Sequence, residues 1–177
     1  MVRNKTYNNV IDTLKNLGEQ HKVIQTTTTG DIYEIDLNKN TLYPLLHINP
    51  VNVQTGQSTL IYNFQIFIMD LVSEKNTWTS SNYISASNLS NEQEVLSECL
   101  QICTDIIGML RHSVWQSETN PIDINEPIMF GEGEFTLEPF NERFDQLVTG
   151  WVFTLPIIVQ NDFQTCNIPV HDRQIVE

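Results

Sequence analysis

The chain has 177 residues, of which 40% are hydrophobic and 18% charged, a composition typical of one globular domain with its own core. Its formal net charge of −13 disfavours attraction to nucleic acid or anionic membranes, because the long-range field repels both. No apolar run reaches the roughly 18 residues of a membrane span, and no signal peptide is expected. Three cysteines without a disulfide pattern favour a reducing cytoplasm.

The first periodic segment, Thr6–Leu17, predicts an amphipathic helix. Gly18 is expected to end it, since glycine commonly follows the last helical turn. The β-branched run Lys22–Thr28 predicts a strand, and Gly30–Asp31 predicts a turn. The apolar stripe of the helix comprises Tyr7, Val10, Ile11, Leu14 and Leu17.

Two runs on either side of Gly56, Ile48–Val53 and Leu60–Val72, predict a long β-hairpin. Pro50 places the first strand near a sheet edge or a strand start, because proline cannot donate to a ladder. The second strand alternates, and one of its faces carries Tyr62, Phe64, Ile66 and Ile68. Its other face is polar first and apolar from Phe67 onward, so we expect one covered face in the first half and two in the second.

The polar segment Ser73–Asn88 follows and contains Trp78 and Tyr83. It is either a long loop or an extension of the hairpin, and long loops in compact domains are often functional. The two aromatic residues are candidate interface anchors, with a simple packing role as the alternative.

The clearest helical pattern of the chain spans Ser90–His112. Ser90 and Gln93 fit a capping box, and Arg111 complements the negative end of the helix dipole. The predicted apolar face comprises Leu96, Cys99, Leu100, Cys103, Ile106, Ile107 and Leu110. A helix with such a face must lie on a sheet.

The last third predicts a short strand at Phe135–Leu137 and a final strand system that begins in Asp145–Thr149 and continues through Gly150–Gln160. Pro156 indicates that this strand is at an edge or bulged. The core face of the strand comprises Trp151, Phe153, Leu155, Ile157 and Val159. Phe163–Glu177 reads as an extended arm with Ile168, Val170, Ile175 and Val176 as candidate interface residues.

These elements predict an α+β fold, a mostly antiparallel twisted sheet with a long β-hairpin, packed by two amphipathic helices. We expect one domain over residues 1–162 with a protruding hairpin and insert, and an extended C-terminal arm over 163–177. The hairpin near Gly56, the insert Ser73–Asn88 and the arm after Ile168 are the expected contact segments.

No pattern of catalytic chemistry accompanies this fold, so we expect no enzyme activity, cofactor or metal. Cys99 and Cys103, one helical turn apart, are typical of two small buried hydrophobes. A pair formed by Cys166 and His171 has no supporting motif. The acidic residues Glu126, Glu132, Glu134 and Glu138 lack calcium-loop spacing and are typical of a solvated loop.

Three segments resemble the tail-terminator and tail-completion proteins of tailed bacteriophages. They are the first helix with KVIQTTTTGDIYEIDLNKNTLYPLLHI, the hairpin strand LIYNFQIFIMDLV with the helix NEQEVLSECLQICTDIIGMLRH, and the late strand GWVFTLPIIVQ. The Asn-, Thr- and Ile-rich character also resembles proteins of crAss-like phages.

The resemblance implies a structural virion protein, a hexameric or dodecameric ring between portal and tail, assembled in the host cytoplasm. It implies contacts with neighbouring portal, neck or tail proteins, DNA passing through the lumen without specific binding, and no membrane partner. Two alternatives remain at this point. One is a small cytoplasmic α+β hydrolase using His171 or the Glu132–Glu138 carboxylates, and the other is a protein-binding module.

Overall fold

The computed structural model describes residues 5–32, 41–57, 59–72, 91–111, 128–130, 134–143 and 147–160. In these residues the chain forms a mixed, mostly antiparallel six-stranded sheet with strand order β1-β2-β3-β6-β4, and β5 pairs with β6 as well. The elements are α1 (Lys5–Gln20), β1 (Thr26–Thr29), β2 (Leu45–Thr55), β3 (Thr59–Leu71), α2 (Glu92–Arg111), β4 (Ile128–Phe130), β5 (Glu138–Arg143) and β6 (Leu147–Gln160).

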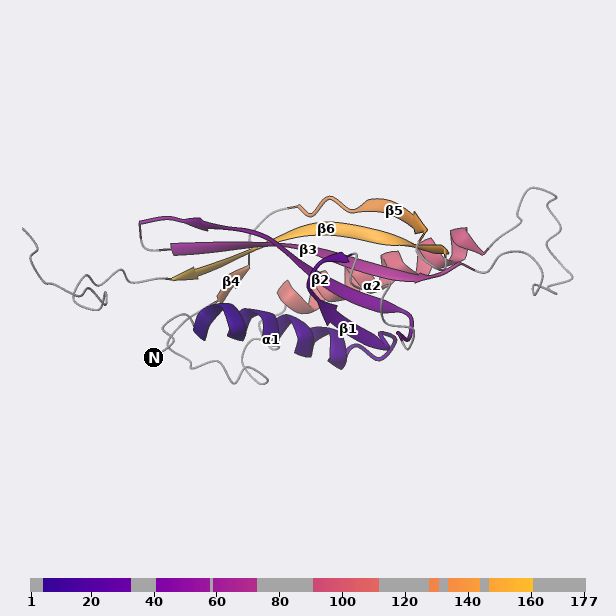
Figure 1. Ribbon diagram of the computed structural model, residues 1–177, viewed down its shortest axis with the longest axis horizontal. Coiled ribbons are helices and arrows are strands. Elements are labelled where there is room, and N and C mark those ends of the chain that lie inside the picture. The colour runs from indigo at the N-terminus through magenta and orange to yellow at the C-terminus, as the bar shows by residue number, and fades with distance from the viewer. Residues whose placement is uncertain are drawn as a thin grey trace, which may run out of the picture.

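Both helices lie on the same face of the sheet (Figure 1), with α2 against β3 and β6 and α1 beside β1. The main core lies between these helices and the sheet. The predicted α+β class, with a long hairpin and two packed amphipathic helices, is therefore confirmed. From α1 the core takes Val10, Leu14 and Leu17, and from the central strands it takes Tyr62, Phe64, Ile66, Ile68, Phe153, Leu155, Ile157 and Val159.

The prediction that Gly18 ends the first helix is wrong, because α1 continues to Gln20. A Cβ atom at Gly18 would lie 2.5 Å from Thr27 Oγ1 and 3.4 Å from Leu46 Cδ1, so glycine allows the helix to approach the sheet closely. The strand predicted over Lys22–Thr28 is shorter and later, at β1.

Helix α2 confirms the predicted periodicity, but the buried face is rotated from the prediction. The buried residues are Val95, Cys99, Ile102, Cys103, Ile106 and Leu110. Leu100 is 37% exposed, and Leu96 and Ile107 are half-buried. Each helical residue advances by about 100°, which puts Cys99 and Ile106 near the centre of the buried face and Leu100 on its flank, beyond Cys103.

The hairpin is confirmed: β2 is longer than predicted, and β3 has the predicted length but lies one residue earlier. At its turn, Gly56 N–H donates to Thr59 O at 2.8 Å. Pro50 lies inside β2, directly before a bulge. It is tolerated there because β1 pairs only with Leu45–Ile48, which leaves the far side of Pro50 without a described strand. The expected change from one to two covered faces along β3 is also confirmed.

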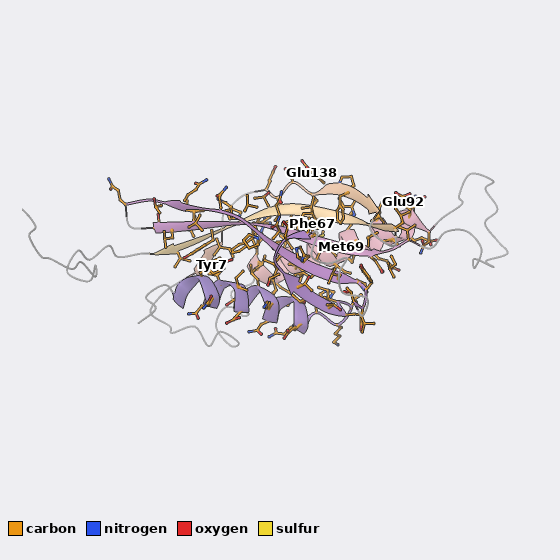
Figure 2. The ribbon with its side chains drawn as sticks, in the orientation of Figure 1. Tyr7, Phe67, Met69, Glu92 and Glu138 are labelled. Carbon is orange, nitrogen blue, oxygen red and sulfur yellow. The ribbon has the colours of Figure 1, made fainter. Side chains whose placement is uncertain are left out.

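The far face of the sheet carries a second, smaller apolar cluster, built from Leu45, Phe67, Met69 and Val148. Phe140 of β5 packs on it, and its ring meets that of Phe67 edge-on, with centroids 5.4 Å apart. Figure 2 shows Phe67 and Met69 within the sheet. This cluster gives the second half of β3 its second cover.

Strand β6 is longer than Gly150–Gln160 and starts at Leu147. β5 pairs with it up to Val152 and β4 from Ile157, so Pro156 occupies the interval where no described strand borders its outer side. The strand predicted at Phe135–Leu137 is wrong. These residues precede β5, and their side chains pack on the main core instead.

The segments Ser73–Asn88 and Phe163–Glu177 lie outside the described residues, as does the Ser90 cap. In the part of the chain that the structure describes, no helix is long and apolar enough to cross a membrane.

Replacing Ile106 by Ala is expected to lower the free energy of unfolding by about 2–5 kcal/mol, because the side chain is 1% exposed and its removal leaves a cavity. Leu100→Ala is the matched control, because Leu100 lies on the flank of the same helix. This substitution should lower the free energy of unfolding by clearly less. Urea denaturation of both variants measures the difference. Equal losses would contradict the observed orientation of α2.

Candidate functional site

The six candidate interface residues named from the sequence lie outside the described residues. They are Trp78, Tyr83, Ile168, Val170, Ile175 and Val176. The same holds for Cys166, His171, Glu126 and Glu132, while Glu134 and Glu138 are described and exposed. The structure therefore neither joins nor separates the predicted contact residues, and the site must be sought in the described part.

His47 is the buried histidine of the described residues, at 1% exposure. Its Nε2 atom lies 3.0 Å from Gly30 O and its Nδ1 atom 2.8 Å from Thr28 Oγ1. Since a carbonyl only accepts, Nε2 carries the proton and Nδ1 accepts from the threonine hydroxyl. Burial lowers the pKa of His47, although the bond to Gly30 O and the charge of Asp31 oppose it. Both ring nitrogens are occupied, so His47 ties β2 to the end of β1.

Cys99 and Cys103 are free and fully buried, which confirms their predicted role as small core residues. Burial raises the pKa of each thiol to about 12, and nearby Asp70 and Glu98 add to the effect at Cys99. The thiolate is the reactive form of cysteine, so neither residue is suited to nucleophilic chemistry.

Asp70 is a half-buried carboxyl near the N-terminal half of α2. Burial raises its pKa most, the charge of Glu98 adds to this, and the bond that Leu71 N–H donates to its Oδ1 opposes it. Across the described residues, no group of three or more His, Cys, Asp or Glu side chains could hold a metal ion.

The feature that stands apart is the hairpin, because almost all of it, up to Met69, lacks charged residues. No Asp, Glu, Lys or Arg occurs from Thr41 to Met69, so all 22 acidic and 9 basic residues of the chain lie elsewhere. We call this stretch the uncharged hairpin. Figure 1 shows its tip running on past the first turn of α1.

The outer half of β2 is a strand edge with no described neighbour. β1 pairs only with the first four residues of β2, which leaves Asn49–Thr55 bordered by β3 alone, and we call these residues the open edge. Val51 and Val53 are each 49% exposed there. Strand edges normally carry charges or prolines that block pairing with another chain. Here Pro50 and the adjacent bulge protect the start, and Asn52–Thr55 has no such protection.

The two faces of the uncharged hairpin differ. On the face away from the helices, Asn49 Nδ2 donates to Gln65 Oε1 at 3.2 Å and Asn63 Nδ2 donates to Asn52 Oδ1 at 2.7 Å. On the helix face, Tyr62 and Phe64 stack beside Tyr7, which lies between α1 and the sheet in Figure 2. These contacts hold the outer strands in place, so the open edge is presented by an ordered support.

The hairpin near Gly56 was expected from the sequence to be a contact segment, but the open edge of β2 was not singled out. The signal was present, since a run of 29 uncharged residues in a chain of net charge −13 can be read directly. The missing information was the length of β1, which decides how much of β2 stays uncovered. No protein-family model matches the chain, and no curated protein sequence does.

Protonation of His47 should destabilise the fold. Because burial lowers its folded pKa below the unfolded value of about 6.5, the unfolded chain binds more protons just below that pH, and stability falls as pH falls. In the native chain, the urea concentration at the unfolding midpoint should fall as the pH is lowered from about 7.5 to 5.5. His47→Gln should be less stable at neutral pH and show a shallower drop, and an identical pH profile in both chains would refute this role.

Proposed function

We propose that this chain is a structural virion protein, a ring-forming subunit of a bacteriophage neck or tail that connects portal and tail as tail-terminator proteins do. The observation that carries the proposal is the uncharged hairpin with its open edge in an otherwise acidic chain. In this proposal the chain forms a homo-oligomeric ring of hexameric or dodecameric type and contacts neighbouring portal, neck or tail proteins. It needs no cofactor.

Electrostatics favours the hairpin as the contact between copies. Each copy has a formal net charge of −13, so two copies repel each other at long range. A contact made by the uncharged hairpin adds no like-charge pair, and salt screens the remaining repulsion over about 8–10 Å near physiological ionic strength. Association through this part of the surface is therefore the least opposed.

The acidic remainder of the surface suits the inside of such a connector. DNA carries a dense negative charge, and a lumen lined by carboxylates would repel it and let it pass without sticking. The proposal places the chain at the neck or tail of the particle after assembly in the host cytoplasm.

The hydrolase alternative, which would use His171 or the Glu132–Glu138 carboxylates, stays a prediction, because His171 and Glu132 lie outside the described residues. His47 has both nitrogens engaged, and the thiols of Cys99 and Cys103 are buried with raised pKa values. The binding-module alternative shares the open edge with the ring proposal, since an extended peptide could also add to it. Copy number separates the two, because a ring subunit is present in several equivalent copies.

Mass spectrometry of purified particles tests the proposal. We expect the chain in tailed particles of the phage that encodes it, in a whole-number copy ratio to the portal. Val53→Lys should lose incorporation, because a charge on the open edge blocks contact there. Val23→Lys is the matched control, since Val23 is equally exposed at 49% but lies in the turn between α1 and β1. Particles that are complete without the chain would refute the proposal.

A further inference from the structure

The tip of the sheet is a block of four strands in matched register. Three rows of directly paired residues cross it, from β2 through β3 and β6 to β4. The rows are Thr55–Leu60–Val159–Ile128, Gln54–Ile61–Ile158–Met129 and Val53–Tyr62–Ile157–Phe130. We call this the tip block. Its two borders are the open edge of β2 and the outer side of β4, and they lie at the same height.

The strand directions of the tip block alternate throughout. β2 is antiparallel to β3, β3 to β6, and β6 to β4, so β2 and β4 run in opposite directions. When a second copy is placed beside the first in the same orientation, its β4 meets the open edge of β2 in antiparallel direction. The hydrogen-bonded pattern of the block can then continue from one copy into the next.

The chemistry of the two borders is compatible. Asn52–Thr55 carries no charge, and neither does Ile128-Met129-Phe130. No described strand borders either one, and the outward backbone donors and acceptors of a strand edge can pair with another strand at the usual spacing of about 4.8 Å.

A contact between the open edge of one copy and β4 of another can be repeated from copy to copy. If two open edges met each other, the contact would be two-fold symmetric and would close after two copies. A contact between the open edge and β4 joins two different patches, so each copy offers one of each and the contacts can close into a ring.

We infer that the open edge of one copy pairs with β4 of the next copy, so that Val53 lies beside Phe130 and Gln54 beside Met129 of the neighbour. This inference rests on the proposed ring function and specifies its contact. Pairing is limited to Asn52–Thr55, because Pro50 has no N–H to donate and the bulge interrupts the edge before Asn52.

Engineered disulfides between copies test the register. In a Cys166→Ser background, Val53→Cys and Phe130→Cys are made in separate full-length chains, which are mixed and oxidised at raised ionic strength. Gln54→Cys with Met129→Cys forms a second pair, because neighbouring rows alternate between wide and narrow spacing and only the narrow one suits a disulfide. Cys99 and Cys103 are buried and do not interfere. Glu94→Cys, exposed on α2, is the control partner.

We expect at least one mixed pair to cross-link about tenfold more than either chain alone or either chain with the control, since only this pairing brings the two positions together. The thermal unfolding midpoint of each variant identifies any variant that fails to fold. If a variant of the first pair does not fold, the cross-link between Gln54→Cys and Met129→Cys tests the register. Homodimers of Val53→Cys would overturn the inference in favour of two-fold pairing. Rings seen by electron microscopy without either cross-link would overturn it and leave the ring proposal standing. If the chain stays monomeric at every concentration and salt level and is absent from particles, both the edge pairing and the ring proposal are refuted.

Discussion

The long antiparallel ladder between β3 and β6 holds the rest of the molecule in place. Every residue of β3 from Thr59 to Leu71 has a partner in β6. The ladder needs a glycine at one point, since a Cβ at Gly150 would collide with the carbonyl oxygen of Ile68 and lie 2.8 Å from Met69 Cα. α2 packs on these two strands, and β2, β4 and β5 are added to their outer sides.

The two ends of this ladder differ on the face away from the helices. At the end near Met69, both faces of the sheet are covered, by the helices on one side and by the cluster with Phe140 on the other. At the end near Thr59, the face away from the helices carries paired amides instead. The helix face is apolar along the whole ladder and supplies the main core, whereas near Thr59 the far face is polar and the outer edge of β2 has no described partner.

Much of this arrangement follows from residue patterns, and the failures have physical causes. The alternation of β3 and β6 predicted which residues face the helices, because period-2 burial is a property of the strand itself. The flank position of Leu100 could not be predicted in the same way, since several apolar residues of α2 compete for the buried face and the neighbouring strands decide among them. Phe135 and Leu137 looked like a strand because they alternate, yet they fill the core from an irregular segment.

For the candidate site too, one part could be predicted from a local sequence pattern and the other part could not. The absence of charge along the hairpin is written in the sequence, whereas the uncovered border depends on where β1 stops pairing, at Ile48. Pairing between distant segments is set by the whole sheet, and a local pattern does not contain it. The aromatic and C-terminal residues first chosen as contacts remain predictions, because they lie outside the described residues.

Hydrogen exchange of the backbone amides of Asn52–Thr55, in the isolated chain and in the assembled particle, tests the central claim most directly. In the isolated chain, the amides of this segment that do not bond to β3 should exchange rapidly, because nothing described covers that side. In the assembly their exchange should slow by roughly tenfold or more, as expected for amides that gain a partner strand. Unchanged rapid exchange in the assembled particle would contradict the account, because the open edge would then have no partner there.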